Sequence, residues 1–135
     1  MILDSNVLID LLDPDAPEAV RSGVMKLAEQ HEMRVNEIVF SEIAHAYKDA
    51  SEVSQMLDAI GITLVRLTLP ECHLAGKAFA EYRRRGGERT TILPDFLIGA
   101  QAASRGWPLV TRDRRGFASY FPEIEIIDPM QVPND

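Results

Sequence analysis

Hydrophobic positions in this chain form short buried runs that alternate with longer stretches of helical spacing. Ile2 and Leu3 open the chain as a short buried strand. A helical pattern follows until Asp13 and Pro14 interrupt it, and its apolar positions are Val7, Leu8, Leu11 and Leu12. A second helix is expected after an N-cap at Asp15. Its apolar stripe is Val20, Val24, Leu27 and Ala28.

The middle of the chain repeats this alternation twice. Residues 34–39 are expected to form a second strand, after which Ser41 would cap a helix with Glu42 in its first turn. Another helix is expected to begin at Ser51 and to stop at Gly61, ahead of a strand over residues 62–66. The apolar faces of these two helices are Ile43, Ala46, Tyr47 and Ala50, and Val53, Met56, Leu57 and Ile60.

The last part of the chain carries two further helices and two further strands. The first helix is expected to begin at Pro70 and to end at Gly86 and Gly87, with three arginines in its last turn. The second begins at Pro94 and stops at Gly106. Residues 109–111 and 124–127 are expected to form the last two strands.

Strands that alternate with helices are typical of an α/β fold. We therefore expect residues 1–135 to form a single domain with a mostly parallel sheet of about four to five strands. Right-handed crossovers would place helices on both faces of the sheet. In such sheets, ligands bind beyond the carboxyl ends of the strands.

Four acidic residues fall where that rule places a ligand site. Asp4 ends the first predicted strand, Glu42 follows the second, and Asp113 follows the strand that ends at Thr111. Asp95 lies at a helix start and could point into the same crevice. Each acid taken alone could instead be a helix cap, a favourable charge at a helix N-terminus or a turn residue.

Carboxylates gathered in this way suit a hard cation such as Mg²⁺ or Mn²⁺. Two like charges about 4 Å apart repel by roughly 4 kcal/mol at an effective dielectric of 20, so the cluster needs a metal ion, protons or both. One or two bound ions could activate water for attack on a phosphodiester. Ser5, Asn6 and Thr111 could orient the ligands by hydrogen bonds, or could be cap and strand-end residues.

Composition excludes several other classes of protein. The chain has 135 residues, of which 46 % are hydrophobic and 26 % charged, and no stretch approaches the roughly 20 apolar residues that span a membrane. The N-terminal segment does not have the pattern of a secretory signal, so we expect a cytoplasmic protein. The lone Cys72 cannot form an internal disulfide, and the three histidines lack the spacing of a zinc site.

The net charge of −7 argues against a nucleic-acid partner until its distribution is considered. Residues 77–115 carry +5, and the remainder carries −12. This asymmetry favours a polyanion-binding face, although a solvated helix face would produce the same composition. The arginines that could flank the acids and hold RNA phosphates are Arg83, Arg84, Arg85, Arg89, Arg112, Arg114 and Arg115.

The acid-bearing segments resemble those of the PIN-domain nucleases, and among them the toxins of VapBC toxin–antitoxin modules. The similar segments are Ile2 to Asn6 (ILDSN), Asn36 to Glu42 (NEIVFSE), Leu93 to Ala100 (LPDFLIGA) and Leu109 to Asp113 (LVTRD). They occur in the family's order and cover essentially the whole chain. One departure is Ser5, where the family more often has Thr, and the hydroxyl is kept.

The resemblance implies an endoribonuclease that needs Mg²⁺ or Mn²⁺ and cuts structured RNA such as tRNA or rRNA. Asp4, Asp95 and Asp113 would then be metal ligands, directly or through water, and Glu42 a further ligand or a water-positioning residue. It also implies a homodimer and a cognate antitoxin that covers or enters the site.

Three other readings can be weighed on the residues. A phosphoacceptor receiver domain needs a Lys after its last core strand, and Lys26, Lys48 and Lys77 are not placed there. A haloacid-dehalogenase-like phosphatase needs a second Asp at the position of Asn6. A catalytically silent PIN-like module that binds RNA or protein remains as the alternative, and the full set of acids disfavours it.

Overall fold

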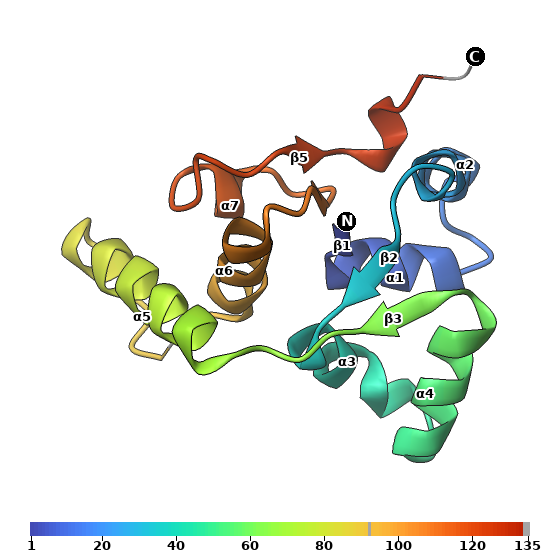
Figure 1. Cartoon of the computed structure of the whole chain (residues 1–135), viewed down its shortest axis with the longest axis horizontal. Helices are drawn as coiled ribbons and strands as arrows, with labels where there is room; N and C mark the ends of the chain where they lie inside the picture. Colours follow the sequence, from blue (N-terminus) through green and yellow to red (C-terminus); the bar gives the residue numbers. More distant parts are fainter. Residues whose placement is uncertain (92, 134–135) are drawn as a thin grey trace.

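The computed structural model describes residues 1–91 and 93–133 as five short strands surrounded by helices (Figure 1). The strands are β1 (Ile2–Leu3), β2 (Met33–Val35), β3 (Ile62–Leu64), β4 (Leu109–Val110) and β5 (Ile126–Ile127). The α-helices are α1 (Ser5–Leu12), α2 (Glu18–Ala28), α3 (Glu37–Ile43), α4 (Ala50–Ala59), α5 (Leu69–Arg84), α6 (Pro94–Arg105) and α7 (Arg115–Ala118). Two 3₁₀ turns are η1 (Ala44–Ala46) and η2 (Pro129–Gln131).

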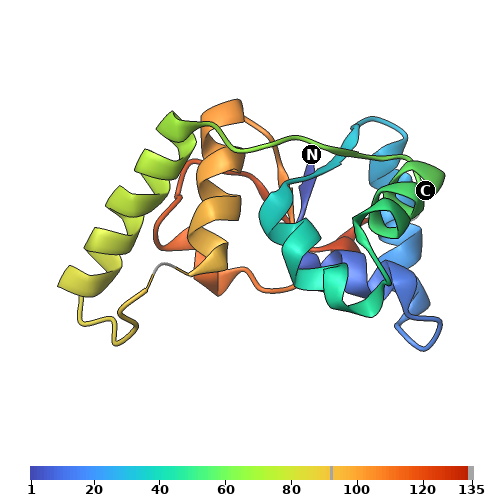
Figure 2. The ribbon, with the colours of Figure 1, turned by 90° about the horizontal axis from the view of Figure 1, so that it is seen from below.

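All five strands are parallel and lie in the order β3-β2-β1-β4-β5. The chain moves outward from β1 to β3 and then crosses to β4, so the direction of winding reverses between β1 and β4. In both views α5 and α6 lie side by side at one end of the molecule, and α2 and α4 lie at the other (Figures 1 and 2). The predicted α/β fold with a parallel sheet and flanking helices is confirmed.

The prediction of a strand over residues 34–39 is wrong in its second half. β2 ends at Val35, and Asn36 caps α3 by accepting hydrogen bonds from the backbone N–H groups of Ile38 (3.0 Å) and Val39 (3.2 Å). Two β-branched residues suggested a strand, but a capped helix satisfies the same backbone donors and still buries Val39.

Two smaller predictions about the residues at which helices begin are also wrong. Ser41 is not a cap, because its hydroxyl donates to the Glu37 carbonyl inside α3, and Glu42 therefore lies near the end of that helix. Asp15 is not the cap of α2, because Pro17 occupies that position and Asp15 belongs to the preceding turn, where its N–H donates to Asp13. Helix α7 was not predicted.

Helix α6 carries Asp95 and is held in place by polar contacts along its length. Gln101 is fully buried, and its side-chain amide donates to the carbonyls of Val65 (3.0 Å) and Arg66 (3.3 Å). At the end of the helix, Arg105 bonds the buried carboxylate of Glu71 on α5 at 2.7 Å. Hydrogen bonds to a buried carboxylate are stronger than neutral ones, so these contacts fix the position of α6.

Helix α2 packs closely against η2 through a glycine. A Cβ atom on Gly23 would lie 1.8 Å from the carbonyl oxygen of Pro129, so α2 and η2 would have to move apart. We expect Gly23→Ala to lower the free energy of unfolding by about 1–3 kcal/mol, the usual cost of overpacking. Urea titration followed by circular dichroism measures this change.

Gly76 on α5 is the matched control, because a Cβ there would meet no atom within 4 Å. Gly76→Ala should raise the free energy of unfolding by about 0.5–1 kcal/mol through helix propensity alone. Equal stability of the two variants would contradict the close approach of α2 and η2.

Candidate active site

Asp4 is buried at the centre of the sheet, with an exposed fraction of 5 %. Its backbone N–H donates to the Val110 carbonyl at 2.9 Å, which continues the pairing of β1 with β4. One carboxylate oxygen accepts from the Ser5 N–H at 2.8 Å and the other from the Thr111 hydroxyl at 2.8 Å. Asp4 is therefore the N-cap of α1 and also presents a fixed carboxylate beyond the strand ends.

Thr111 joins this carboxylate to the loop that carries Asp113. Its hydroxyl oxygen accepts from the Asp113 N–H at 3.0 Å and from the Asn6 side-chain amide at 3.4 Å. Asn6 also accepts from the Arg112 N–H at 3.3 Å. The structure thus places the three predicted positioning residues, Ser5, Asn6 and Thr111, around Asp4 and Asp113.

The four predicted acids come near enough to one another to interact electrostatically. Burial, followed by the charges of Asp4, Asp113 and Glu42, raises the pKa of Asp95 from 3.8 to about 6. Burial raises the pKa of Glu42, while a hydrogen bond from Ser5 offsets part of the shift. The structure therefore brings together side chains from the ends of β1 and β4, from α3 and from the start of α6.

The pKa of Asp4 is also raised, mainly by burial, and the hydrogen bonds from Thr111 and Ser5 oppose this. Nearby Asp113 adds a further increase to the pKa of Asp4. No Lys or Arg of the described chain contributes to the shifts of Asp4, Glu42 or Asp95. The cluster lacks an internal counter-charge, so protons or a cation must compensate its negative charge.

Gly116 on α7 lies against the carboxylate of Asp95 and was not singled out from the sequence. A Cβ atom at Gly116 would lie 2.9 Å from Asp95 Oδ2. The residue therefore leaves room for the carboxylate. The glycine follows Asp113 by three residues in a polar segment, and nothing in that local pattern indicates contact with α6.

The donor set has the right chemistry for Mg²⁺ or Mn²⁺, since all four side chains offer carboxylate oxygens. Within residues 1–91 and 93–133, no three acidic, His or Cys side chains lie close enough together to enclose one ion. Mg²⁺ usually keeps several waters and uses only one or two carboxylates directly, so this spacing is compatible with ligands that act through water.

The seven predicted RNA-binding arginines separate into two groups. Arg84 and Arg85 form ion pairs with Glu81, and Arg83 donates to the Arg89 carbonyl, all near the end of α5. Figures 1 and 2 show this end of α5 as its most distant part from β1. The second group, Arg112, Arg114 and Arg115, surrounds Asp113 in the sequence, and Arg112 Nη1 is held by Asp10 at 2.8 Å.

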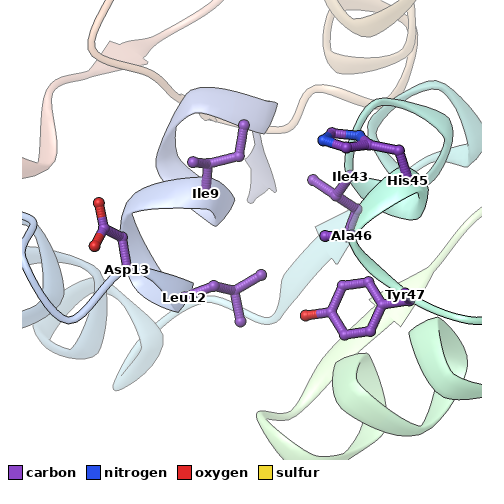
Figure 3. A pocket seen from close by; sticks show the side chains of 7 residues that line it. All are labelled: Ile9, Leu12, Asp13, Ile43, His45, Ala46 and Tyr47. Carbon is purple, nitrogen blue, oxygen red and sulfur yellow. The ribbon is translucent and has the colours of Figure 1, made fainter.

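An apolar cavity of about 480 Å³ lies between α1, the end of α3 and η1. Figure 3 shows Ile9 and Leu12 of α1 facing Ile43, Ala46 and Tyr47 from α3, η1 and the residue after it, with His45 at the edge. Ile9 is 48 % exposed, which is high for a large apolar side chain. Asp13 also lines this mainly apolar cavity, and none of the four clustered acids does.

The fold and the cluster together define a parallel α/β domain with carboxylates at the switch point of its sheet. The sequence profile of the PIN domain family matches residues 1–120. The chain therefore belongs to the PIN domain family. A search of curated proteins finds no match. The described part of the chain contains no helix long and apolar enough to cross a membrane.

Solved structures with the same fold include several toxin–antitoxin complexes. The DNA-bound VapBC of Salmonella typhimurium has 25 % sequence identity and a TM-score of 0.71, with 95 % of this chain and 96 % of that chain covered. VapBC2 from Rickettsia felis, bound to a promoter DNA fragment, has 17 % identity and a TM-score of 0.71 over 93 % and 96 % of the two chains. VapBC-1 from nontypeable Haemophilus influenzae has 16 % identity and a TM-score of 0.72 over 96 % and 98 %.

The raised pKa of Asp95 has a consequence for stability in the metal-free protein. Because the folded state binds the Asp95 proton more tightly than the unfolded chain does, this stabilisation is complete below pH 3.8 and is lost as the pH rises through about 6. Asp95→Asn removes a charge that is costly first because it is buried and then because it repels Asp4, Asp113 and Glu42. We expect the variant to be more stable than wild type at pH 7 and to lose this advantage toward pH 4.

Urea titrations in EDTA at pH 4, 5, 6 and 7 measure this effect. Asp58→Asn is the control, because it removes one acidic charge from an exposed position on α4. If Asp95→Asn gains no more stability at pH 7 than Asp58→Asn does, the inference that burial and neighbouring acids destabilise the charged form of Asp95 is wrong.

Proposed function

We propose that this chain is a metal-dependent endoribonuclease, the toxin component of a toxin–antitoxin pair. The observation that carries the proposal is the convergence of Asp4, Glu42, Asp95 and Asp113 at the switch point of the sheet without a cationic neighbour that offsets them. Such a cluster raises the energy of the metal-free fold, so it is best understood as a site for a cation. Membership in the PIN domain family supports the nuclease reading.

In this proposal Asp4, Asp95 and Asp113 hold one or two Mg²⁺ or Mn²⁺ ions directly or through water, and Glu42 is a further ligand or positions water. A divalent ion supplies an activated water and stabilises charge on the phosphate and the leaving 3′-oxygen. Thr111 and Ser5 keep the Asp4 carboxylate oriented through their hydrogen bonds. The products would carry a 5′-phosphate and a 3′-hydroxyl.

The substrate we propose is structured cytoplasmic RNA such as tRNA or rRNA. The +5 charge of residues 77–115 offers phosphate contacts on a chain whose net charge is −7. Arg112, Arg114 and Arg115 follow or flank Asp113 and would contact phosphates near the cut. Arg83, Arg84, Arg85 and Arg89 would contact RNA farther from it.

A cognate antitoxin is the proposed protein partner. The three similar structures described above are of VapBC, and each has the fold of this chain. The cavity between Leu12 and Ile43 would receive apolar side chains of the antitoxin. We also propose a homodimer, to which Leu69, 84 % exposed at the start of α5, would contribute apolar surface.

A catalytically silent PIN-like module that binds RNA or protein is the second candidate. One observation favours it, namely that no three potential ligands among the described residues are close enough together to hold an ion. The two candidates differ in whether divalent ions bind and whether RNA is cut, so one set of experiments separates them.

Asp4→Asn tests the nuclease proposal directly. The variant keeps one side-chain oxygen, which can still accept from the Ser5 N–H, whereas an NH₂ group replaces the oxygen that accepts from Thr111 and the site loses one negative charge. We expect RNA cleavage in Mg²⁺ or Mn²⁺ to fall at least about a hundredfold, as for loss of a key electrostatic group. The measurement uses total cellular RNA with mapping of new 5′ ends, and an EDTA sample shows the dependence on metal. Equal cleavage by variant and wild type, or cleavage unaffected by EDTA, would contradict the assignment.

Gly116→Ala tests whether the position of Asp95 matters. The new methyl group would displace the Asp95 carboxylate, since the two would approach to 2.9 Å. We expect cleavage to fall about tenfold to a hundredfold, the range seen when a reacting group is misplaced by about 1 Å. A higher Mn²⁺ concentration should be needed for half-maximal rate. Gly76→Ala, in open space on α5, serves as the control, and equal rates for both variants would show that α7 moves instead of Asp95.

A further inference from the structure

Another cavity shares one residue, Thr111, with the surroundings of the acid cluster. It has a volume of about 310 Å³ and lies between the ends of β4 and β5 and the turn η2. Its lining residues are Thr111, Arg112, Arg114, Ile126, Asp128 and Gln131. Thr111 is a wall of this cavity and also donates to Asp4, so a ligand in the cavity would lie next to the proposed cleavage site.

The cavity combines three kinds of surface in a small volume. Arg114 is exposed, and within the described chain its guanidinium has neither an ion pair nor a hydrogen bond. Asp128 uses one carboxylate oxygen to cap η2 by accepting from the Met130 N–H at 2.9 Å, which leaves the other oxygen for a ligand. Half-buried Ile126 adds an apolar wall.

The two arginines of the cavity differ in their availability. Arg112 already donates to Asp10 on α1 at 2.8 Å, and this ion pair holds the loop that carries Asp113. Breaking it would cost part of any energy gained from a ligand. Arg114 is therefore the cation that is available for a phosphate group.

We propose that this cavity is a subsite for one ribonucleotide of the RNA strand, adjacent to the phosphodiester that is cut. Arg114 binds the phosphate of that nucleotide. The carboxylate of Asp128 accepts a hydrogen bond from the ribose 2′-hydroxyl, the group that distinguishes RNA from DNA. Gln131 offers both a donor and an acceptor to a base edge. The inference rests on the proposed function, which supplies the neighbouring cleavage site.

Two features favour a nucleotide over a lone phosphate. A carboxylate beside the arginines disfavours a second anionic group but suits a hydroxyl donor. The volume of about 310 Å³ also lies at the lower end of the range of roughly 300–1,000 Å³ that small-molecule pockets occupy, so a single nucleotide is a ligand of suitable size.

Binding of mononucleotides tests the subsite without any cleavage, because they contain no phosphodiester. The four ribonucleoside 5′-monophosphates, their 2′-deoxy counterparts and inorganic phosphate are titrated separately into the wild-type protein in EDTA. Nuclear magnetic resonance follows the side-chain amide of Gln131 and the backbone amides of residues 111–114, 126–128, 130 and 131. We expect at least one ribonucleotide to shift these signals and to bind about fivefold more tightly than its deoxy form, as for one lost hydrogen bond.

Three variants assign the contacts. Arg114→Gln should weaken ribonucleotide binding about tenfold, through loss of a charge-assisted hydrogen bond. Asp128→Asn keeps a side-chain oxygen for the cap of η2 and should bring the ribose and deoxyribose affinities closer together. Arg66→Gln is the control, because Arg66 is exposed, pairs with Glu37 and does not line the cavity. The ribonucleotide affinity of the Arg66→Gln variant should equal that of the wild-type protein.

Several outcomes would overturn the subsite. These are an absence of shifts around the cavity, an affinity unchanged by Arg114→Gln, or equal binding of ribonucleotides and inorganic phosphate. The nuclease proposal stands or falls separately. Metal-dependent cleavage without mononucleotide binding would remove only the subsite. Mononucleotide binding without cleavage would remove the nuclease proposal and leave a ribonucleotide site with no cleavage site beside it.

Discussion

The parallel pairing of β1 with β4 is the interaction on which the candidate site depends. These two strands lie far apart in the sequence, yet the Asp4 N–H donates to the Val110 carbonyl at 2.9 Å. The same register places the Thr111 hydroxyl on the Asp4 carboxylate. The sheet reverses its direction of winding between these two strands, and in parallel α/β sheets such a reversal leaves a crevice beyond the strand ends. The other acids reach that space from α3, α6 and the loop after β4.

The cost of the cluster is what makes it informative about function. A fold selected only for stability would replace at least one of these acids, since each raises the energy of the others when charged. Asp95 expresses this cost most clearly, because burial and three neighbouring acids together raise its pKa to about 6. The Asp4 carboxylate is held by two hydrogen bonds despite its burial. The structure therefore stabilises the orientation of a group whose charge it does not neutralise, which is the arrangement expected of a cation ligand.

The charged residues outside the cluster differ in the contacts that they make. Outside residues 77–115 the chain carries a charge of −12, and this negative charge repels other acidic molecules. Near the end of α5, Arg84 and Arg85 pair with Glu81 and Arg83 bonds the Arg89 carbonyl. Arg114 lines the cavity that Thr111 shares with the acid cluster, and among the described residues it has no such partner. Sequence alone assigned all seven arginines the same role. Contacts in the tertiary structure separate those that stabilise a helix end from those that lie beside the site.

Local patterns were enough to determine the fold class and much of the candidate site. The alternation of short buried runs with helical stripes required a parallel α/β sheet, and such sheets place the residues after Leu3 and after Val110 at one edge. Helix ends were predictable where one residue decides them, as at Gly106, whose φ of 66° suits a residue without a side chain. These features depend on neighbours in the sequence, so the sequence alone could show them.

Tertiary structure decided whatever depended on distant partners. Ile38 and Val39 have β-branched side chains typical of a strand, but the cap at Asn36 and the burial of Val39 made their segment a helix. The contact of Gly116 with Asp95 and the cavity around Arg114 join segments whose local patterns contain no sign of each other. Sequence periodicity records which face of an element is buried. It does not record which element lies opposite, and that second fact positions the acids and shapes the cavity beside them.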